Sequence, residues 1–390
     1  MSAGGARLAG SIPDLLIVGG GIVGAACAWE AVRAGLRVTV VESGPIGGGA
    51  SAAGMGHLVV MDDSDAQFAL TRYSLDCWLE LRPQLPADAE YDPCGTLWIA
   101  ADEEEMGEVR RKQAYLVSQG AAKAIEVLDP VQLRQAEPAL REGLAGALRV
   151  IDDAVVYTPC VVRWLLDEVV RLGGEVRAGE VVELLSDGVR LADGSRLLAA
   201  ATVNAGGTSA PRLTPGIPVV PRKGHLAITD RYPGWVRHQL VELGYLKSAH
   251  GSTSDSVAFN VQPRRTGQLL IGSSRQFGVE TPEVEGEMLG RMLRRAVEYL
   301  PSIGDLSVLR GWAGFRPATP DNLPLIGRWP VGGGEDDRAV WLATGHEGLG
   351  ITTSLGTARL LVDQIVGRPS PIPVESYWPT RSSSNGEGHG

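Results

Sequence analysis

The segment 14–43 constrains the fold of this chain more than any other part of the sequence. It holds an apolar run, three spaced glycines and a second apolar run that ends in Glu42. This order predicts a strand, a tight turn, a helix and a parallel strand. Gly19 permits the turn, Gly21 lets the backbone approach a pyrophosphate, and Gly24 lets the helix pack against the strand. The segment therefore predicts a βαβ unit that binds a dinucleotide.

The two ends of this unit indicate how such a ligand is held. The predicted helix begins at Ile22, and free N–H groups at Ile22 and Val23 favour a phosphate. Glu42 ends the second strand just before Ser43, where a carboxylate accepts from ribose hydroxyls and disfavours the 2′-phosphate of NADP. An ordinary glycine turn is the alternative reading, but Ala28 and the terminal acid follow in the order that a dinucleotide site requires.

Length and charge argue against several other classes of protein. The chain has 390 residues, of which 44% are hydrophobic and 21% charged, as in a globular protein of more than one domain. Its net charge of −10 argues against nucleic acid as the main partner. The apolar run 15–26 is too short to cross a bilayer, and the start lacks the pattern of a signal peptide. We therefore expect no transmembrane segment and a cytoplasmic location in a bacterium.

The cysteines do not indicate a metal site. None of them has the CxxC or CxxxH spacing that is typical of metal ligands. We expect no bound metal and four reduced thiols. They are Cys27, Cys77, Cys94 and Cys160.

A second glycine-rich segment, 47–57, follows the ribose-binding acid at once. Its Ser51 hydroxyl and backbone N–H groups suit contacts to phosphate or to a flavin ring. A nicotinamide dehydrogenase continues instead with further βαβ units, and this chain has no second GxGxxG turn for such a cofactor. Three further glycine turns, at 204–207, 311–316 and 345–350, are expected to end strands that converge on one crevice.

These motifs, taken in order, resemble the D-amino-acid oxidase superfamily of flavoproteins, in its glycine oxidase and sarcosine oxidase branch. The resemblance covers residues 12–375. It implies an α/β (α+β) fold, in which a Rossmann-like FAD-binding domain joins an antiparallel-sheet substrate domain. It also implies FAD in an extended pose, and we expect non-covalent FAD because no attachment motif is present. The matching residues are Gly19, Gly21, Gly24, Ala28, Gly35 and Glu42, then 49–51, 203–207, 312–321 and 345–348.

The same resemblance implies a discontinuous FAD-binding domain. Separate stretches of the chain come together in it, and the substrate domain is inserted between them. The predicted segments are 12–85, 150–216 and 309–375 for the FAD-binding domain, 86–149 and 217–308 for the substrate domain, and 1–11 and 379–390 for flexible tails.

The reaction that the resemblance implies is oxidation of the C–N bond of a small amino acid. Hydride leaves Cα for flavin N5 and an imine forms, so the cofactor supplies the difficult chemistry. Residues 52–63 and 345–351 are also similar to bacterial D-hydroxyproline dehydrogenases, which makes cis-4-hydroxy-D-proline the expected substrate. Two alternatives stay open: a sarcosine, glycine or D-amino-acid oxidase that uses oxygen, and a flavin-containing non-catalytic or electron-relay subunit. A separate electron acceptor or partner subunits are compatible with this reading.

The resemblance also assigns roles to single residues. It places a substrate-binding arginine at Arg316, whose forked guanidinium matches a carboxylate. The alternative for Arg316 is a structural ion pair, for example with Asp321. His57 is expected near the flavin ring, either in contact with the ring or the substrate or as a packed histidine. His225 is expected to face either the substrate or the core.

The chain departs from glycine oxidase at two positions. Asn260 stands where that enzyme has its substrate-binding tyrosine, and Gly348 stands where it has a second active-site arginine. Both changes leave more room and less charge, which fits a secondary amine better than glycine. Tyr245 is a candidate to replace the lost hydroxyl, or else a buried tyrosine of the sheet.

The remaining expected cofactor contacts lie in or beside the glycine segments. Backbone N–H groups around 348–350 are expected to face the flavin and to stabilise its reduced anion. The contacts expected in addition to those above are Gly49, Ala50, Gly54, Met55, Gly56, Val182, Ala205, Gly206, Gly314, Gly345, His346, Glu347, Leu349, Gly350 and Ile351, with His57 and Arg316 counted among them.

Overall fold

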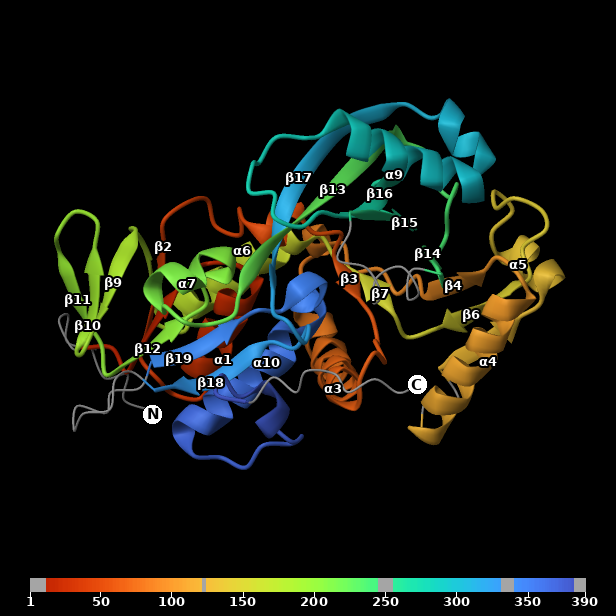
Figure 1. The fold of residues 1–390 in the computed structure, drawn as a ribbon. Helices are drawn as coiled ribbons and strands as arrows, with labels where there is room; N and C mark the ends of the chain where they lie inside the picture. The colour runs from red at the N-terminus through yellow and green to blue at the C-terminus, as the bar shows by residue number, and fades with distance from the viewer. Residues whose placement is uncertain (1–11, 121–123, 245–254, 331–339, 382–390) are drawn as a thin grey trace.

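The computed structural model describes residues 12–120, 124–244, 255–330 and 340–381. Two large sheets carry most of its architecture, one at the left and one at the upper right of Figure 1. The first has six strands in the order β18-β19-β12-β1-β2-β8, all parallel except β18. These strands are β1 (Leu15–Val18), β2 (Val38–Glu42), β8 (Glu175–Ala178), β12 (Ala201–Asn204), β18 (Leu325–Trp329) and β19 (Val340–Thr344).

The six-stranded sheet is covered on both faces, which explains why β1 is a continuous apolar run. Successive side chains alternate between the faces, so Leu15 and Ile17 contact the helices while Leu16 and Val18 contact a small three-stranded sheet. The covering elements are α1 (Ile22–Arg33), α3 (Asp65–Leu81), α6 (Thr158–Arg171), α10 (Gly350–Val366), β9 (Val181–Leu185), β10 (Gly188–Leu191) and β11 (Arg196–Leu198).

The second sheet has eight strands in the order β17-β13-β16-β15-β14-β4-β6-β5. Its neighbours are antiparallel except for the parallel pair β14 and β4. The strands are β4 (Thr96–Ala100), β5 (Ile125–Leu128), β6 (Gly146–Val150), β13 (Val220–Arg231), β14 (Gln239–Glu242), β15 (Ser256–Pro263), β16 (Gln268–Arg275) and β17 (Val308–Ala318).

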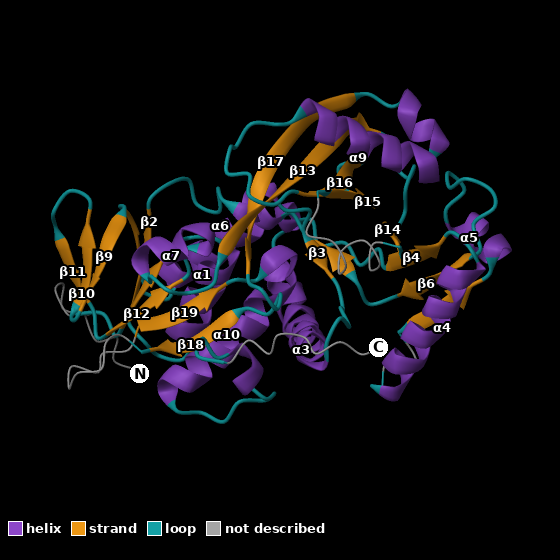
Figure 2. Cartoon of the chain, in the orientation of Figure 1, coloured by secondary structure: helices purple, strands orange, loops and turns teal. Residues whose placement is uncertain are grey.

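One face of the eight-stranded sheet is closed by a helix, which Figure 2 shows lying along β13, β16 and β15. This helix, α9 (Gly286–Tyr299), packs Met292 and Ala296 against Phe259 of β15. The opposite face is left for a cavity, described below. The remaining helices and short strands are α2 (Ala50–Ala53), α4 (Glu103–Ser118), α5 (Pro130–Ala136), α7 (Ala210–Leu213), β3 (His57–Leu58) and β7 (Ala154–Val155).

This architecture confirms the predicted fold class and corrects one predicted turn. Residues 311–316 do not end a strand, because they lie inside β17 and pair with β13 along its length. Residues 308–318 therefore belong to the eight-stranded sheet, although the sequence grouped 309–375 with the FAD-binding segments. None of the helices in the described ranges combines the length and apolarity that a bilayer span requires.

Candidate active site

A cavity of about 510 Å³ is lined by residues from both large sheets. Val18 and Glu42 contribute from the ends of β1 and β2, and Asn260 and Arg316 contribute from the eight-stranded sheet. The carboxyl ends of the parallel strands thus open into the same space as the second sheet. This is the crevice where open α/β sheets bind ligands.

The glycine turn between β1 and α1 has the close packing that the sequence predicts. Gly19 has a φ of 110°, and a Cβ there would lie 2.6 Å from the Ala205 carbonyl oxygen. A Cβ on Gly24 would lie only 2.0 Å from the carbonyl oxygen of Gly19. Gly21 caps α1 without a side-chain hydrogen bond, so the start of this helix is open to the cavity. The turn is therefore a ready phosphate site.

Two side chains fix the edges of this site. The Ser51 hydroxyl accepts from the Ile22 N–H at 2.9 Å, which joins the second glycine segment to the start of α1. The Glu42 carboxylate accepts from the Gly20 N–H at 2.6 Å and from the Gly44 N–H at 2.8 Å. These bonds hold the carboxylate at the cavity wall, where it suits ribose hydroxyls.

Two glycines on the cavity face of the eight-stranded sheet let other residues pack closely against it. A Cβ on Gly314 would lie 2.3 Å from the Ala53 Cβ, and one on Gly224 would lie 2.5 Å from Arg316 Nη1. The missing side chains let α2 and the arginine approach the strands directly. In addition, Trp312 Nε1 donates to the Ala53 carbonyl at 3.2 Å and fixes α2 against β17.

Arg316 projects from β17 and lines the cavity. Its Nη1 donates to the Ser274 carbonyl at 3.1 Å. The predicted alternative, an ion pair with Asp321, is wrong, because Asp321 binds Arg381 at 2.8 Å. Among the described residues Arg316 has no ion-pair partner within 4.0 Å. Its guanidinium is therefore placed to bind an anion in the cavity.

Close to Arg316 lie a buried acid and two arginines. The sequence did not indicate that these three residues form a group. Arg222 Nη1 lies 3.1 Å from a Glu347 carboxylate oxygen, and Arg275 Nε lies 3.8 Å from the same oxygen. Burial opposes ionisation of Glu347, but the neighbouring arginines overcome it and lower its pKa. Glu347 therefore stays ionised and balances part of the positive charge around Arg316.

His57 and Asn260 both line the cavity. Burial lowers the pKa of His57 to about 4 despite the opposing effect of Gln262, so the imidazole is neutral at pH 7. Its Nε2 has no hydrogen-bond partner in the described part of the chain. Asn260 Oδ1 is likewise buried without a donor there.

Most of the other expected contacts also line the cavity, including His346 and the segment 347–351. The His346 ring is fixed by a 3.0 Å contact with the Thr357 hydroxyl, and burial lowers its pKa to about 3. His225 is buried, contacts Ser274 Oγ at 2.9 Å and does not line the cavity. The expected contacts that do line the cavity are Gly19, Gly21, Ile22, Val23, Ser43, Gly49, Ala50, Ser51, Gly54, Met55, Gly56, Ala205, Gly206, Gly314, Gly348, Leu349, Gly350 and Ile351.

Three expected cofactor contacts do not line the cavity. Val182 is 48% exposed on the outer face of β9, and its neighbour Val181 lines the cavity instead. Gly24 is enclosed by the packing of α1, and a Cβ on Gly345 would lie 2.7 Å from Thr319 Cγ2. Gly24 and Gly345 therefore permit close packing at their turns and do not form part of the cavity surface. Tyr245 lies outside the described residues.

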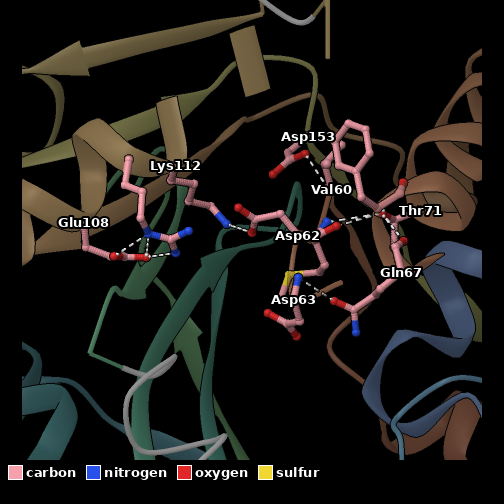
Figure 3. Close-up of polar contacts among 11 residues, drawn as sticks. Val60, Asp62, Asp63, Gln67, Thr71, Glu108, Lys112 and Asp153 are labelled. Carbon is pink, nitrogen blue, oxygen red and sulfur yellow. Dashed lines mark hydrogen bonds and ion pairs between the residues drawn. The ribbon is translucent and has the colours of Figure 1, made fainter. Parts of the chain in front are cut away.

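The extended segment 59–63 forms another part of the cavity wall, and Figure 3 shows how its polar residues are held. Met61 and Asp63 line the cavity, whereas the Val60 N–H is bound by Asp153 Oδ1 at 3.2 Å. Asp62 forms a buried ion pair with Lys112 of α4. The sequence analysis missed this anchor because its partners are far apart in the chain.

The pKa of Asp153 gives a stability prediction. Burial raises it from 3.8 to about 7. Between pH 4 and 7 the unfolded chain therefore releases a proton that the folded chain keeps, so stability falls as pH rises from about 4 to about 7 and the loss is complete above that. Asp153→Asn should remove this loss and exceed the parent protein in stability at pH 8 by roughly 2–4 kcal/mol.

Urea unfolding of both proteins at pH 5 and pH 8 checks this prediction. The advantage of Asp153→Asn should widen as pH rises. The same advantage at both pH values, or none at pH 8, would show that Asp153 is already ionised in the folded protein.

The fold and the cavity define a dinucleotide-dependent oxidoreductase. The chain belongs to the DAO family of FAD-dependent oxidoreductases, whose profile matches residues 14–364. It is 28% identical to a glycine oxidase of Pseudomonas aeruginosa, over 94% of this chain and 98% of that protein. It is also 28% identical to a D-amino acid dehydrogenase of Methylobacterium sp., over 93% of this chain and 97% of that protein. The crystal structure of glycine oxidase from Geobacillus kaustophilus superposes with a TM-score of 0.84 at 26% identity, covering 95% of this chain and 99% of that one.

FAD is therefore the cofactor, as the sequence predicts, and the residues present fit it. The start of α1, where the N-cap residue Gly21 has no side chain, suits the pyrophosphate, and Glu42 suits a ribose. Gly224 and Gly314 let Arg316 and α2 lie close against the sheet at the cavity wall. The family and the cavity together establish an FAD-dependent enzyme.

Proposed function

We propose that this enzyme oxidises the C–N bond of a small secondary amino acid, with cis-4-hydroxy-D-proline as its substrate and FAD bound non-covalently. The observation that carries the proposal is Arg316, which lines the cavity without an ion-pair partner among the described residues. A half-buried guanidinium that Glu347 only partly balances favours an anionic ligand, and a substrate carboxylate supplies one. Two relatives are a glycine oxidase and a D-amino acid dehydrogenase, which supports an amino acid as that anion.

The chain's own residues bind and orient the substrate. Arg316 holds the carboxylate bidentately, so one end of the amino acid is fixed on β17. FAD, when bound, supplies the hydride acceptor. His57 is neutral at pH 7 and can hydrogen-bond a neutral amine without repelling it. Gly348 lies beside Arg316 without a side chain, and Asn260 lines the same cavity, which supports a substrate larger than glycine.

The visible spectrum of the purified protein under nitrogen tests this proposal. A flavin spectrum that bleaches within seconds of adding cis-4-hydroxy-D-proline is the expected result. Acid precipitation should release the FAD into the supernatant, because it is not covalently attached. Oxygen uptake by the reduced enzyme, compared with reduction of an artificial dye, then separates an oxidase from a dehydrogenase.

Other outcomes of this experiment are equally informative. Bleaching by sarcosine, glycine or D-alanine but not by cis-4-hydroxy-D-proline would reject the proposed substrate. A flavin spectrum that no amino acid bleaches would favour the electron-relay subunit instead.

A further inference from the structure

Arg316 reaches its hydrogen-bond partner across a neighbouring strand. Its strand β17 pairs with β13, and β13 pairs with β16, so Ser274 of β16 stands two strands away. A Cβ on Gly224 of β13 would lie 2.5 Å from Arg316 Nη1, so the guanidinium crosses β13 at a residue that has no side chain. Nη1 then donates to the Ser274 carbonyl at 3.1 Å. The direction of the guanidinium therefore depends on where this carbonyl points.

The chain is irregular where β16 passes Ser274. Ala227 of β13 lies opposite Ile271 of β16. Four residues earlier in the chain, Lys223 lies opposite Gln276, which comes five residues after Ile271. The segment of β16 therefore has one residue more than the segment of β13 that it faces, which defines a bulge. A bulge interrupts the regular hydrogen bonds between strands, and here the Ser274 carbonyl bonds to a side chain instead.

The backbone and the side chain of His225 both hold Ser274. The His225 backbone N–H donates to Ser274 Oγ at 2.8 Å, and Nδ1 of the buried ring lies 2.9 Å from the same oxygen. The ring Nε2 accepts from the Glu285 N–H at 3.1 Å. Burial, and then the charge of Lys223, hold the pKa of His225 below its usual value, so the ring is neutral at pH 7. A neutral ring that accepts at Nε2 carries its hydrogen on Nδ1, so Nδ1 donates to Ser274.

We propose that His225 and Ser274 are positioning residues for Arg316. His225 holds Ser274 through two hydrogen bonds, and the Ser274 carbonyl holds Nη1 of the guanidinium. Because the guanidinium is planar, a bond at Nη1 limits where its other N–H groups point. Neither His225 nor Ser274 lines the cavity, so they act through Arg316 without contacting the substrate. This inference rests on the proposed function, in which Arg316 binds the substrate carboxylate.

Binding of pyrrole-2-carboxylate to the oxidised, FAD-loaded enzyme tests this role without turnover. The compound has a five-membered ring and a carboxylate like proline, but its C2 carries no hydrogen that could leave as hydride. The measured quantity is its Kd, from the change in the flavin spectrum. Ser274→Ala and His225→Leu should each raise this Kd about tenfold, because Arg316 loses its fixed position. His225→Asn keeps a side-chain donor near the place of Nδ1 and should recover most of the affinity lost in His225→Leu.

Combination with Arg316→Met separates positioning from a general structural effect. If Ser274 acts through Arg316, Ser274→Ala should raise the Kd no further once the guanidinium is absent, because the effects of coupled residues do not add. A matched control is Ser74→Ala. Ser74 is a buried serine of α3 that does not line the cavity, and its Oγ has no hydrogen-bond partner among the described residues. This variant should keep the parent Kd.

Three other outcomes are decisive. Equal increases in Kd with and without Arg316, or loss of FAD from both Ser274→Ala and His225→Leu, would show a purely structural role and overturn the inference. An unchanged Kd in both variants would also overturn it and leave the proposed function standing. If cis-4-hydroxy-D-proline does not reduce the flavin, while binding of pyrrole-2-carboxylate still depends on Arg316 and Ser274, the proposed substrate fails and the positioning role stands.

Discussion

Arg316→Met should lower the second-order rate constant of flavin reduction by roughly 100- to 1,000-fold, while FAD stays bound. Arg316 lines the cavity, has no ion-pair partner among the described residues and is fixed by the Ser274 carbonyl. Truncating one member of a buried charged pair costs about 2–5 kcal/mol, and 1.4 kcal/mol corresponds to a factor of ten. The loss should fall on substrate affinity first, because the carboxylate does not change during the reaction.

Arg316→Lys separates charge from shape. A lysine keeps the positive charge but loses the planar fork that binds both carboxylate oxygens. We expect it to recover part of the rate lost in Arg316→Met and to remain below the parent enzyme. Stopped-flow reduction over a range of substrate concentrations measures affinity and limiting rate separately.

Arg310→Met is a suitable control for Arg316, because Arg310 lies on the same strand, is exposed and does not line this cavity. It should reduce its flavin at the parent rate. If Arg316→Met retains the parent rate, the substrate carboxylate is bound elsewhere, and Arg275 is the next residue to change.

The parts of the fold that local signals encode could be predicted from the sequence. The unit 14–43 depends on glycine spacing and apolar runs, and the structure has its strand, helix and strand in that order. The apolar residues of 66–82 recur at helical spacing, and the structure has α3 there. Asp129 caps α5 in a capping box with Gln132, a signal that spans only four residues.

The charged cluster around Glu347 could not be predicted in the same way. Arg222 and Arg275 meet Glu347 only because β13 pairs with β17 on one side and β16 on the other. That pairing joins residues far apart in the chain, and no local motif specifies it. The error at 311–316 has the same origin, because its glycines look like a turn until their close contacts with α2 are known.

A shift of one residue also decides which side of a strand faces the cofactor. The sequence placed Val182 in the site, but the cavity contains Val181. Period-two alternation fixes which residues share a face, and only tertiary packing says which face is inside. Similarly, Asp62 and Asp63 look equivalent in sequence, yet Asp62 is buried against Lys112 while Asp63 lines the cavity.

Gly24→Ala should abolish retention of FAD through purification and lower the melting temperature by about 5 °C or more. The added Cβ would lie 2.0 Å from the Gly19 carbonyl oxygen. The oxygen belongs to the backbone of the turn, and a Cβ is fixed on its own backbone, so no flexible side chain can move aside. Relief requires α1 to shift away from β1, which displaces the start of the helix from the phosphate position. The ratio of absorbance at 450 and 280 nm measures the retained flavin.

Gly107→Ala makes the same chemical change in a helix where the added methyl meets nothing within 4 Å. It should keep full FAD content and gain up to about 1 kcal/mol, because alanine is the better helix former. The contrast separates the steric effect from a general response to alanine. If Gly24→Ala also kept its FAD, the close approach of α1 to the turn would not be what positions the phosphate site. The binding of FAD would then depend chiefly on Glu42 and on the Ser51 bond to α1.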